Sequence, residues 1–301
     1  MSNIVMPAQN SVTVNIVNAF VKDGAGGNPA GVVLDADGLD ESAMQRIAAA
    51  AGLSETAFVS TSATEAFKLD FFTPTRRIAH CGHATIGTFS ILAARGRVIE
   101  GATSKETVDG PRAIEIIGGA AYMERLAPKY SDPKDWDGVT KEAVLASLGL
   151  STDSLVEGGA PVVVDTGNRF LLVGVTDAAT LAAIEPDQAA IEAISDRLDL
   201  IGFYVFTPVR DGTVAATTRM FAPRYGIAEE SATGMAAGPL GCLLFDRFGV
   251  KGPWMDIEQG TLMTPSSPSL LNVRLQIADG AVAGLMVGGF GRIVEERTVT
   301  F

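Results

Sequence analysis

The order of predicted elements repeats along the chain, and this repeat constrains the fold more than any other feature. Each half begins with a Gly-Asn pair, continues through a strand, a helical segment and two strands, and ends in a Gly- and Thr-containing turn that enters an apolar helix. The pairs are Gly27-Asn28 and Gly167-Asn168, and the turns begin near Cys81 and Ser231. A matching order of five elements is hard to attribute to chance, so we predict a diverged internal duplication.

The residue periodicity supports this order of elements. Residues 12–17 alternate between apolar and polar side chains in the manner of a strand, whereas residues 40–51 place apolar side chains on one helical face, with Asp40 as a candidate N-cap. After the two turns, residues 85–95 and 235–248 are mostly apolar on every side, which is typical of buried helices.

The chain is long enough for two domains, and we predict an α+β protein with two half-domains. The first covers residues 1–127 and the second residues 128–287, and a final strand at about residues 288–301 can return to the first half-domain. Residues 130–159 contain several Asp and Gly residues and one short predicted helix, and we interpret them as the connection between the halves.

The composition excludes several classes of function. The 301 residues carry a formal net charge of -12, which argues against a nucleic-acid partner because nucleic-acid sites are usually basic. No apolar run reaches the ~18 residues of a membrane span, and residues 1–7 lack the basic and apolar segments of a signal peptide, so we expect a cytoplasmic protein with no membrane partner. With two cysteines, two histidines and no nucleotide or pyridoxal-phosphate motif, we expect no metal and no cofactor.

The first turn gathers candidate acid–base groups at a predicted helix start. Backbone N–H groups in the first turn of a helix are unpaired and partly positive, which favours a carboxylate ligand and lowers the pKa of a thiol. The small residues Gly82 and Ala84 allow a ligand to approach the backbone. Cys81 is therefore a candidate thiolate acid–base and His83 a candidate proton relay. The alternative is a small buried cysteine beside a hydrogen-bonded core histidine.

The second turn places two carboxylates and a hydroxyl before a helix. Glu229 and Glu230 precede Ser231, and Thr233 and Gly234 open the helix. The N-termini of the helices at the two turns would together bind a small anionic amino or hydroxy acid. The alternative is an ordinary helix start, whose acidic residues stabilise the helix dipole.

A third candidate is Glu55, which lies between a predicted helix and an apolar strand. Partial burial raises the pKa of a carboxylate toward the range that suits proton transfer to and from carbon. The alternative is a solvated loop carboxylate. Cys242 lies among leucines within a predicted helix, and we interpret it as a core residue.

Six short segments are specific as an ordered set: residues 27–34, 53–58, 72–74, 82–87, 229–234 and 258–260. Together they resemble the motifs of the PhzF-like family of phenazine biosynthesis, within the diaminopimelate epimerase fold. The resemblance implies two pseudo-symmetric half-domains, each a mostly antiparallel sheet wrapped around a central helix, with the active site in the cleft between them. It also implies Glu55 as the general acid/base, supporting roles for Asn28, His83 and Glu230, and a homodimer.

Two departures from the related families bear on the substrate and on Cys81. Glu230, Ser231 and Met235 stand where the PhzF-like pattern more often has Asp, Pro and Ser, so the phenazine-pathway substrate is not carried over to this chain. The related proline racemases and diaminopimelate epimerases use two cysteines; Cys81 resembles the first, but Ser231 stands at the position of the second. Because a serine hydroxyl is a far weaker acid than a thiol, two-cysteine racemisation is disfavoured.

Three functional hypotheses follow. The leading one is a cofactor-independent isomerase or epimerase that moves a proton on a small, anionic, carboxylate-bearing metabolite, with Glu55 as general acid/base. The expected catalytic residues are Glu55, His83, Glu230 and Cys81. The expected substrate-binding residues are Asn28, Gly82, Ala84, Ser231, Thr233 and Gly234. The alternatives are a Cys81-based amino-acid racemase or hydroxy-amino-acid dehydratase, and a non-catalytic small-molecule or protein-binding module on the same scaffold.

Overall fold

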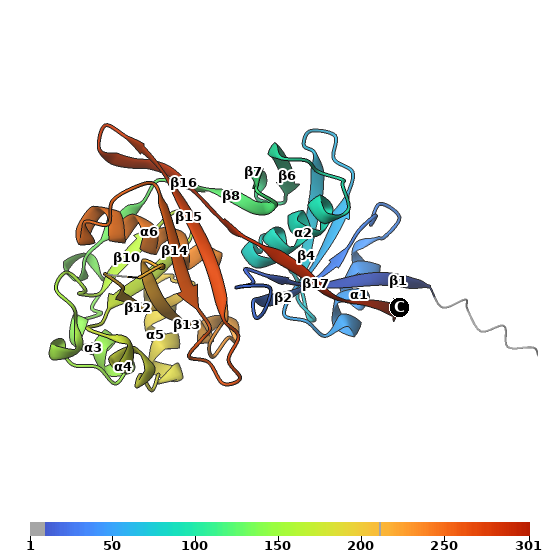
Figure 1. Cartoon of the computed structure of the whole chain (residues 1–301). Helices are drawn as coiled ribbons and strands as arrows, with labels where there is room; N and C mark the ends of the chain where they lie inside the picture. Colours follow the sequence, from blue (N-terminus) through green and yellow to red (C-terminus); the bar gives the residue numbers. More distant parts are fainter. Residues whose placement is uncertain (1–9, 211) are drawn as a thin grey trace, which may run out of the picture. The chain divides into compact units, whose positions relative to one another are not determined.

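The computed structural model describes residues 10–210 and 212–301, which form two compact units (Figure 1). Unit 1 combines the N-terminal segment through Ala19 with Pro29–Ala121 and Gly291–Phe301, and unit 2 combines Phe20–Asn28 with Tyr122–Phe290. The prediction about a signal peptide concerns residues 1–7, which lie outside the described residues. Each unit is described by itself.

The elements follow one another in the order that the repeat predicts. The first half of the chain contains β1 (Ser11–Ala19), β2 (Asn28–Val33), α1 (Glu41–Ala51), β3 (Thr56–Ser60), β4 (Phe67–Phe72), β5 (Arg77–Ile78), α2 (Gly82–Ala94), β6 (Gly101–Thr107), β7 (Gly110–Ile117), β8 (Ala120–Leu126) and β9 (Lys129–Ser131). The second half contains η1 (Pro133–Asp135), α3 (Lys141–Ser147), η2 (Thr152–Ser154), β10 (Val162–Asp165), β11 (Arg169–Gly174), α4 (Ala178–Ala182), α5 (Gln188–Leu198), β12 (Gly202–Pro208), β13 (Ala216–Phe221), η3 (Pro223–Tyr225), α6 (Gly234–Phe248), β14 (Trp254–Gln259), β15 (Ser269–Ala278), β16 (Ala281–Gly289) and β17 (Gly291–Thr300).

The two units repeat the same pattern of strand pairing, which confirms the predicted pseudo-symmetry. In unit 1, β2 pairs in parallel with β3, β3 antiparallel with β4, β4 in parallel with β6, and β6 antiparallel with β7. In unit 2, β11, β12, β13, β14 and β15 pair successively in the same four orientations. Hairpin pairings such as β10 with β11 and β15 with β16 make the sheets mostly antiparallel, as predicted.

Strand β17 closes the sheet of unit 1 with residues from the other end of the chain. It pairs antiparallel with β1, from Ser11 opposite Thr300 to Ala19 opposite Gly291 (Figure 1). This pairing places the last strand of the chain beside the first. No helix within the described residues is both long enough and apolar enough to span a membrane.

Capping residues determine where α1 begins and ends. The Asp40 side chain accepts a hydrogen bond from the backbone N–H of Ala43 at 2.7 Å, so the predicted N-cap is confirmed. Gly52 ends the helix with φ 67, a left-handed conformation that glycine adopts without steric cost. The chain then turns directly into β3, and this turn carries Glu55.

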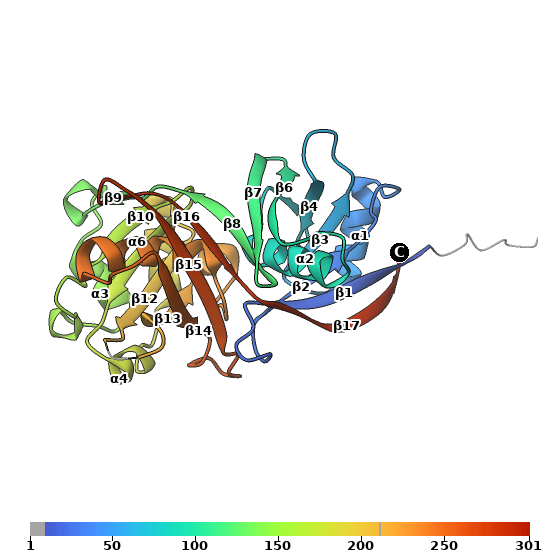
Figure 2. The same cartoon turned by 45° about the horizontal axis from the view of Figure 1, so that its top comes forward.

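The central helix of each unit is buried on every side. In α2, all residues from Gly82 to Leu92 are buried, and the helix contacts β1, β3 and β17 (Figure 2). In α6, burial is continuous from Ala236 to Leu244, and the helix contacts β10, β11, β15 and β16. Helices that are apolar all round are stable only inside a protein, which explains why the sheets wrap around them.

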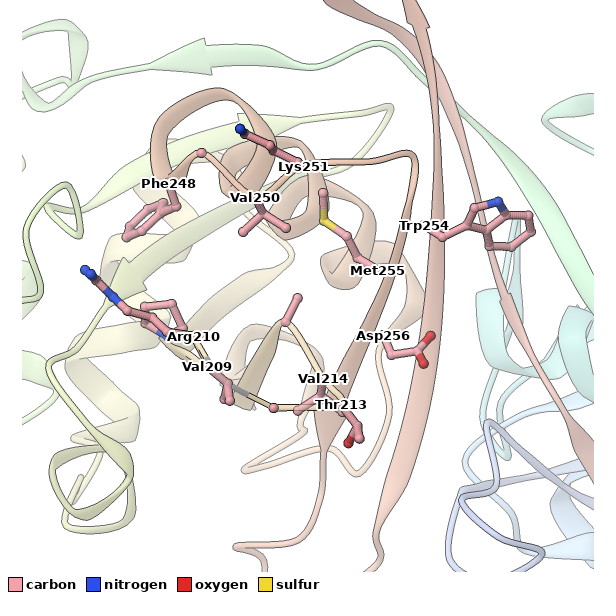
Figure 3. Close-up of a pocket in the computed structure, with 14 residues that line it drawn as sticks. Val209, Arg210, Thr213, Val214, Phe248, Val250, Lys251, Trp254, Met255 and Asp256 are labelled. Carbon is pink, nitrogen blue, oxygen red and sulfur yellow. The ribbon is translucent and has the colours of Figure 1, made fainter.

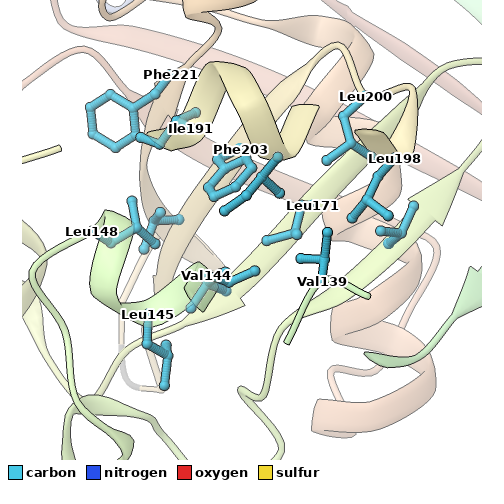
Figure 4. Packing of buried hydrophobic residues seen from close by; sticks show 14 of the residues in the cluster. Val139, Val144, Leu145, Leu148, Leu171, Ile191, Leu198, Leu200, Phe203 and Phe221 are labelled. Carbon is cyan, nitrogen blue, oxygen red and sulfur yellow. The ribbon is translucent and has the colours of Figure 1, made fainter. Parts of the chain in front are cut away.

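One expectation about unit 2 is wrong. Residues 130–159 were expected to connect the halves, but this stretch supplies part of the hydrophobic core of unit 2. Val144 and Leu145 from α3 are at most 3 % exposed and belong to a cluster with Leu171 of β11 and Phe203 of β12 (Figure 4). The segment looks like a linker in sequence because most of its Asp and Gly residues lie on the surface while most of its few large apolar residues are buried.

Candidate active site

Glu55 lies at the entrance to β3 in unit 1. Its backbone carbonyl accepts a hydrogen bond from Gly31 N–H at 2.9 Å, which fixes the residue against the start of the parallel β2–β3 pair. Its side chain is only 15 % exposed and lies 3.2 Å from Nε2 of His83, measured from Oε2. Glu55 is therefore a largely desolvated carboxylate with a specific partner, rather than a solvated loop residue.

Cys81 and His83 lie at the start of α2, in the same unit. Cys81 is the extended N-cap residue, and Thr85 Oγ1 donates a hydrogen bond to its carbonyl at 2.6 Å. The Cys81 side chain contacts the imidazole instead of capping the helix, with Sγ 3.5 Å from Nδ1 of His83. His83 thus lies between two acidic groups, Cys81 at one ring nitrogen and Glu55 at the other.

Burial and mutual charge set the protonation of these three groups. Burial lowers the pKa of His83, but Cys81 and Glu55 outweigh it and raise that pKa well above its usual value. Burial raises the pKa of Glu55, but the hydrogen bond and charge of His83 reverse the shift and hold that pKa below its usual range. Burial raises the pKa of Cys81. The lowered pKa of Glu55 and the raised pKa of His83 both favour an ion pair between the carboxylate and the imidazolium.

Two expectations about these pKa values are therefore wrong. The helix start was expected to lower the pKa of the Cys81 thiol, but complete burial has the larger effect and raises it. Burial was expected to raise the pKa of Glu55, but the nearby His83 has the larger effect and lowers it. Both errors have the same cause. The effect that decides each pKa, which is burial for Cys81 and the nearby His83 for Glu55, arises only when the chain is folded.

A second group of polar residues forms in unit 2 around Glu230. Asn28 is 6 % exposed, and its Nδ2 donates to Glu230 Oε1 at 2.9 Å and to the Ala232 carbonyl at 3.0 Å. The Thr233 hydroxyl donates to the other carboxylate oxygen of Glu230. Ser231 is buried, and its hydroxyl donates to the Gly27 carbonyl at 3.0 Å. The structure thus brings Asn28, Glu230, Ser231 and Thr233 together.

Gly82, Ala84 and Gly234 lie where the sequence predicts, at helix starts. Gly82 and Gly234 are the first residues of α2 and α6, and Ala84 lies in the first turn of α2. The Cys81 and Thr233 side chains leave the first-turn N–H groups uncapped. Such N–H groups can bind an anion.

Sequence reasoning missed Gln259, whose side chain forms hydrogen bonds with the polar group around Glu230. Its side chain is fully buried; Nε2 donates to the Glu230 carbonyl at 2.7 Å and to the Thr233 hydroxyl at 3.1 Å. Its Oε1 accepts from Thr233 N–H at 3.1 Å and from the Tyr204 hydroxyl at 3.0 Å. Gln259 belongs to the family-like motif at residues 258–260, but that motif alone did not indicate which residues the glutamine contacts.

Gly260 follows this glutamine, and we expect that no side chain fits there. Its φ is +81, and a Cβ would lie 2.2 Å from the Ser267 carbonyl oxygen and 2.7 Å from that of Ser231. Gly260→Ala should lower the free energy of unfolding by about 2–4 kcal/mol, the sum of left-handed strain and overpacking. The matched control is Gly249→Ala, where φ is +68 but nothing lies within 4 Å, and about 1 kcal/mol is expected. Equal losses in urea denaturation would contradict this account.

A surface pocket elsewhere in unit 2 lacks these features. Its volume is about 510 Å³, and Arg210, Lys251, Trp254 and Asp256 contribute to its wall (Figure 3). Asp256 accepts a hydrogen bond from Asn272 Nδ2 at 2.6 Å. The described residues that line this pocket include none of the predicted site residues.

Comparisons with known proteins indicate the same family as the sequence motifs. Residues 17–295 match the family of phenazine biosynthesis-like proteins, PhzC-PhzF. The chain belongs to this family. A crystal structure of a PhzF-family phenazine biosynthesis protein from Bacillus anthracis superposes with a TM-score of 0.86 at 26 % identity, covering 97 % of this chain and 100 % of that chain. The predicted family and fold class are therefore confirmed.

Relatives in this family are named isomerases. An uncharacterized isomerase of Clostridium acetobutylicum is 33 % identical over 233 residues, which are 76 % of this chain and 77 % of that protein. The trans-2,3-dihydro-3-hydroxyanthranilate isomerase of Pseudomonas aeruginosa is 31 % identical over 291 residues, which are 93 % of this chain and 96 % of that protein. The chain is an enzyme of the isomerase class, which sets aside the alternative of a non-catalytic binding module.

Proposed function

We propose that this isomerase moves a proton from one carbon to another on a small carboxylate-bearing substrate, with Glu55 as the general acid and base. The observation that carries the proposal is the desolvated Glu55 carboxylate 3.2 Å from His83 Nε2. A general base must remain ionised where bulk water is excluded, and a partner of opposite charge makes that possible. His83 supplies this charge without taking the place of the base.

Such a reaction needs no cofactor to balance, because Glu55 both removes a proton and returns one. Glu55 takes a proton from a carbon α or allylic to the substrate carboxylate, and negative charge develops on the substrate. The uncapped N–H group of Gly82 at the start of α2 can stabilise that charge. Once protonated, Glu55 no longer forms an ion pair with His83. Because release of the proton restores that pair, the protonated Glu55 is a stronger acid than it would be without His83. It therefore returns a proton to a different carbon, and because its side chain is 15 % exposed, that proton can exchange with solvent while Glu55 carries it.

Cys81 has a positioning role in this mechanism. It holds the imidazole through Nδ1, so that Nε2 stays directed at Glu55. The alternative of Cys81 as catalytic base requires a thiolate, and burial raises the pKa of this thiol. A partner base at Ser231 is also disfavoured, because its hydroxyl is engaged with the Gly27 carbonyl.

Cys81→Ser separates these two roles. We expect the variant to keep its activity within about tenfold, because it loses one weak hydrogen bond to His83 while Glu55 remains. Serine is a preferred N-cap residue, so α2 should still form. The measurement is the rate of isomerisation, with circular dichroism as the check on folding. A folded Cys81→Ser protein without activity would assign the base to Cys81 instead.

The substrate class can be tested by solvent exchange. We expect the wild-type protein in D₂O to incorporate deuterium into at least one member of a panel of small amino and hydroxy carboxylates that includes trans-2,3-dihydro-3-hydroxyanthranilate. Mass spectrometry and NMR give the position of the label. The polar group around Glu230, with Asn28 and Thr233, is expected to bind hydroxyl or amino groups of the ligand. A compound that Glu55→Gln isomerises as fast as the wild-type protein does, with both proteins folded, would argue against proton transfer through Glu55.

A further inference from the structure

Glu55, Cys81 and His83 also have the composition of a metal site. Each can offer one ligand atom, and these atoms lie within 4.8 Å of one another. Cys81 is 4 % and His83 6 % exposed, and the Glu55 side chain is 15 % exposed, so few waters compete for the position. The count of two histidines predicted no metal site, but a mixed set of sulfur, nitrogen and oxygen needs only one of them.

The contact between Cys81 and His83 has the spacing of two ligands around zinc. Zinc binds sulfur at about 2.3 Å and nitrogen or oxygen at about 2.0–2.2 Å, so neighbouring ligands in a tetrahedron are about 3.3–3.6 Å apart. Sγ of Cys81 lies 3.5 Å from Nδ1 of His83, and Oε2 of Glu55 lies 3.2 Å from Nε2. An imidazole binds one metal ion through one nitrogen, so an ion at Nδ1 keeps the contact with Cys81. The Glu55 carboxylate, whose ligand atom lies within 4.8 Å of the other two, must then move toward the ion.

The ligand types select among metal ions. Thiolate and imidazole are soft or borderline ligands that favour Zn²⁺ and Co²⁺ over Mg²⁺ and Ca²⁺, which prefer sets of oxygen ligands. The charges also balance, because a divalent cation with one carboxylate and one thiolate is neutral as a group. Neutrality removes most of the cost of placing a divalent ion in a buried position. Three protein ligands leave a fourth coordination position open.

We propose that Glu55, Cys81 and His83 form a zinc site, and that a bound zinc ion inhibits the enzyme by occupying the carboxylate that serves as its base. On binding, the Cys81 thiol and the His83 imidazolium each release one proton to solvent, and no oxidation or reduction occurs. Inhibition rests on the proposed role of Glu55, whereas metal binding does not. The two parts are therefore tested by separate measurements.

Cobalt(II) is the spectroscopic probe for the binding part. The full chain, reduced and freed of metal with a chelator, is titrated with Co²⁺. We expect one ion per chain, a thiolate-to-cobalt charge-transfer band in the near ultraviolet and strong visible bands of a tetrahedral site, all of which Zn²⁺ removes. Cys81→Ser should lose the charge-transfer band. His83→Gln and Glu55→Gln should each weaken binding by at least about tenfold.

Cys242→Ala is the matched control, because Cys242 is the other free cysteine and is buried within α6. It should keep the charge-transfer band and the affinity of the wild type. A wild-type protein without the band, or a band that persists in Cys81→Ser, overturns the site. If a variant fails to fold, protection of the wild-type thiol from a maleimide by Zn²⁺, mapped by mass spectrometry to Cys81 or Cys242, decides the same question.

Zinc inhibition of solvent deuterium exchange is measured on the same preparation. We expect the exchange rate to fall in proportion to zinc occupancy and to recover fully with a chelator. A cobalt site that fills without loss of exchange overturns the inhibitory part and also argues against Glu55 as base. An unfilled site with normal, Glu55-dependent exchange overturns the zinc proposal alone.

Discussion

Glu55→Gln is expected to abolish solvent deuterium exchange, with a fall in rate of about 10²–10⁴-fold, the usual contribution of a positioned general base. The amide has the shape of the carboxylate but cannot accept the proton. The fold should survive, because the backbone carbonyl of residue 55 still accepts its hydrogen bond from Gly31. The exchange rate is measured on the carboxylate that the wild-type protein turns over.

The control for this variant is Glu157→Gln, which removes an exposed carboxylate far along the chain in a turn. It should exchange at the wild-type rate. Comparable activity in Glu55→Gln and Glu157→Gln, with both proteins folded, would remove Glu55 from the mechanism. Partial loss in Glu55→Gln combined with complete loss in Cys81→Ser would instead support the alternative in which Cys81 is the base.

Arg219→Met is expected to lower the free energy of unfolding of unit 2 by about 3–5 kcal/mol, because it leaves a buried charge without its partner. Nε and Nη2 of Arg219 bind the two carboxylate oxygens of Glu229, each at 2.9 Å. Its Nη1 donates to the carbonyls of Leu181 at 3.2 Å and Ile184 at 2.9 Å. The arginine thereby fixes the segment that carries Glu230, so ligand binding should weaken as well.

Two further variants show whether burial is the cause. Arg224→Met removes an arginine that also pairs with two carboxylates, Asp196 and Asp199, but those are 60 % and 79 % exposed. A loss of at most about 1 kcal/mol is expected there. Glu229→Gln in the Arg219→Met background should recover part of the stability, since it removes the unpaired charge. Urea denaturation of all four proteins gives the comparison, and equal losses for Arg219→Met and Arg224→Met would contradict the account.

Much of the secondary structure could be predicted because its determinants are local. Asp40 and Gly52 bound α1 through contacts with residues three or four positions away. The mostly apolar character of α2 and α6 predicted buried helices, and the sheets do surround them. The linker-like composition of residues 130–159 failed as a guide, because inward-facing residues such as Leu145 are sparse in sequence and become a core only on folding.

The sequence singled out candidate residues, but it did not predict how they contact one another. Glu55, Cys81 and His83 were each singled out from the residues around them, and the fold brings them into one group. The contact between Glu55 and His83 joins positions 28 residues apart, and periodicity contains no information about such a contact. Gln259 was missed for the same reason, since its role consists of hydrogen bonds to residues far away in the chain.

The sequence by itself therefore determined the duplicated order of elements, the family, and the list of side chains able to move a proton. These follow from motif order and local periodicity, which are properties of neighbouring residues. Only the tertiary structure decided that His83 lies between Glu55 and Cys81, that the pKa of the carboxylate is lowered and that the pKa of the thiol is raised. The physical reason is that a pKa depends on burial and on charges through space, and both are set by the folded chain.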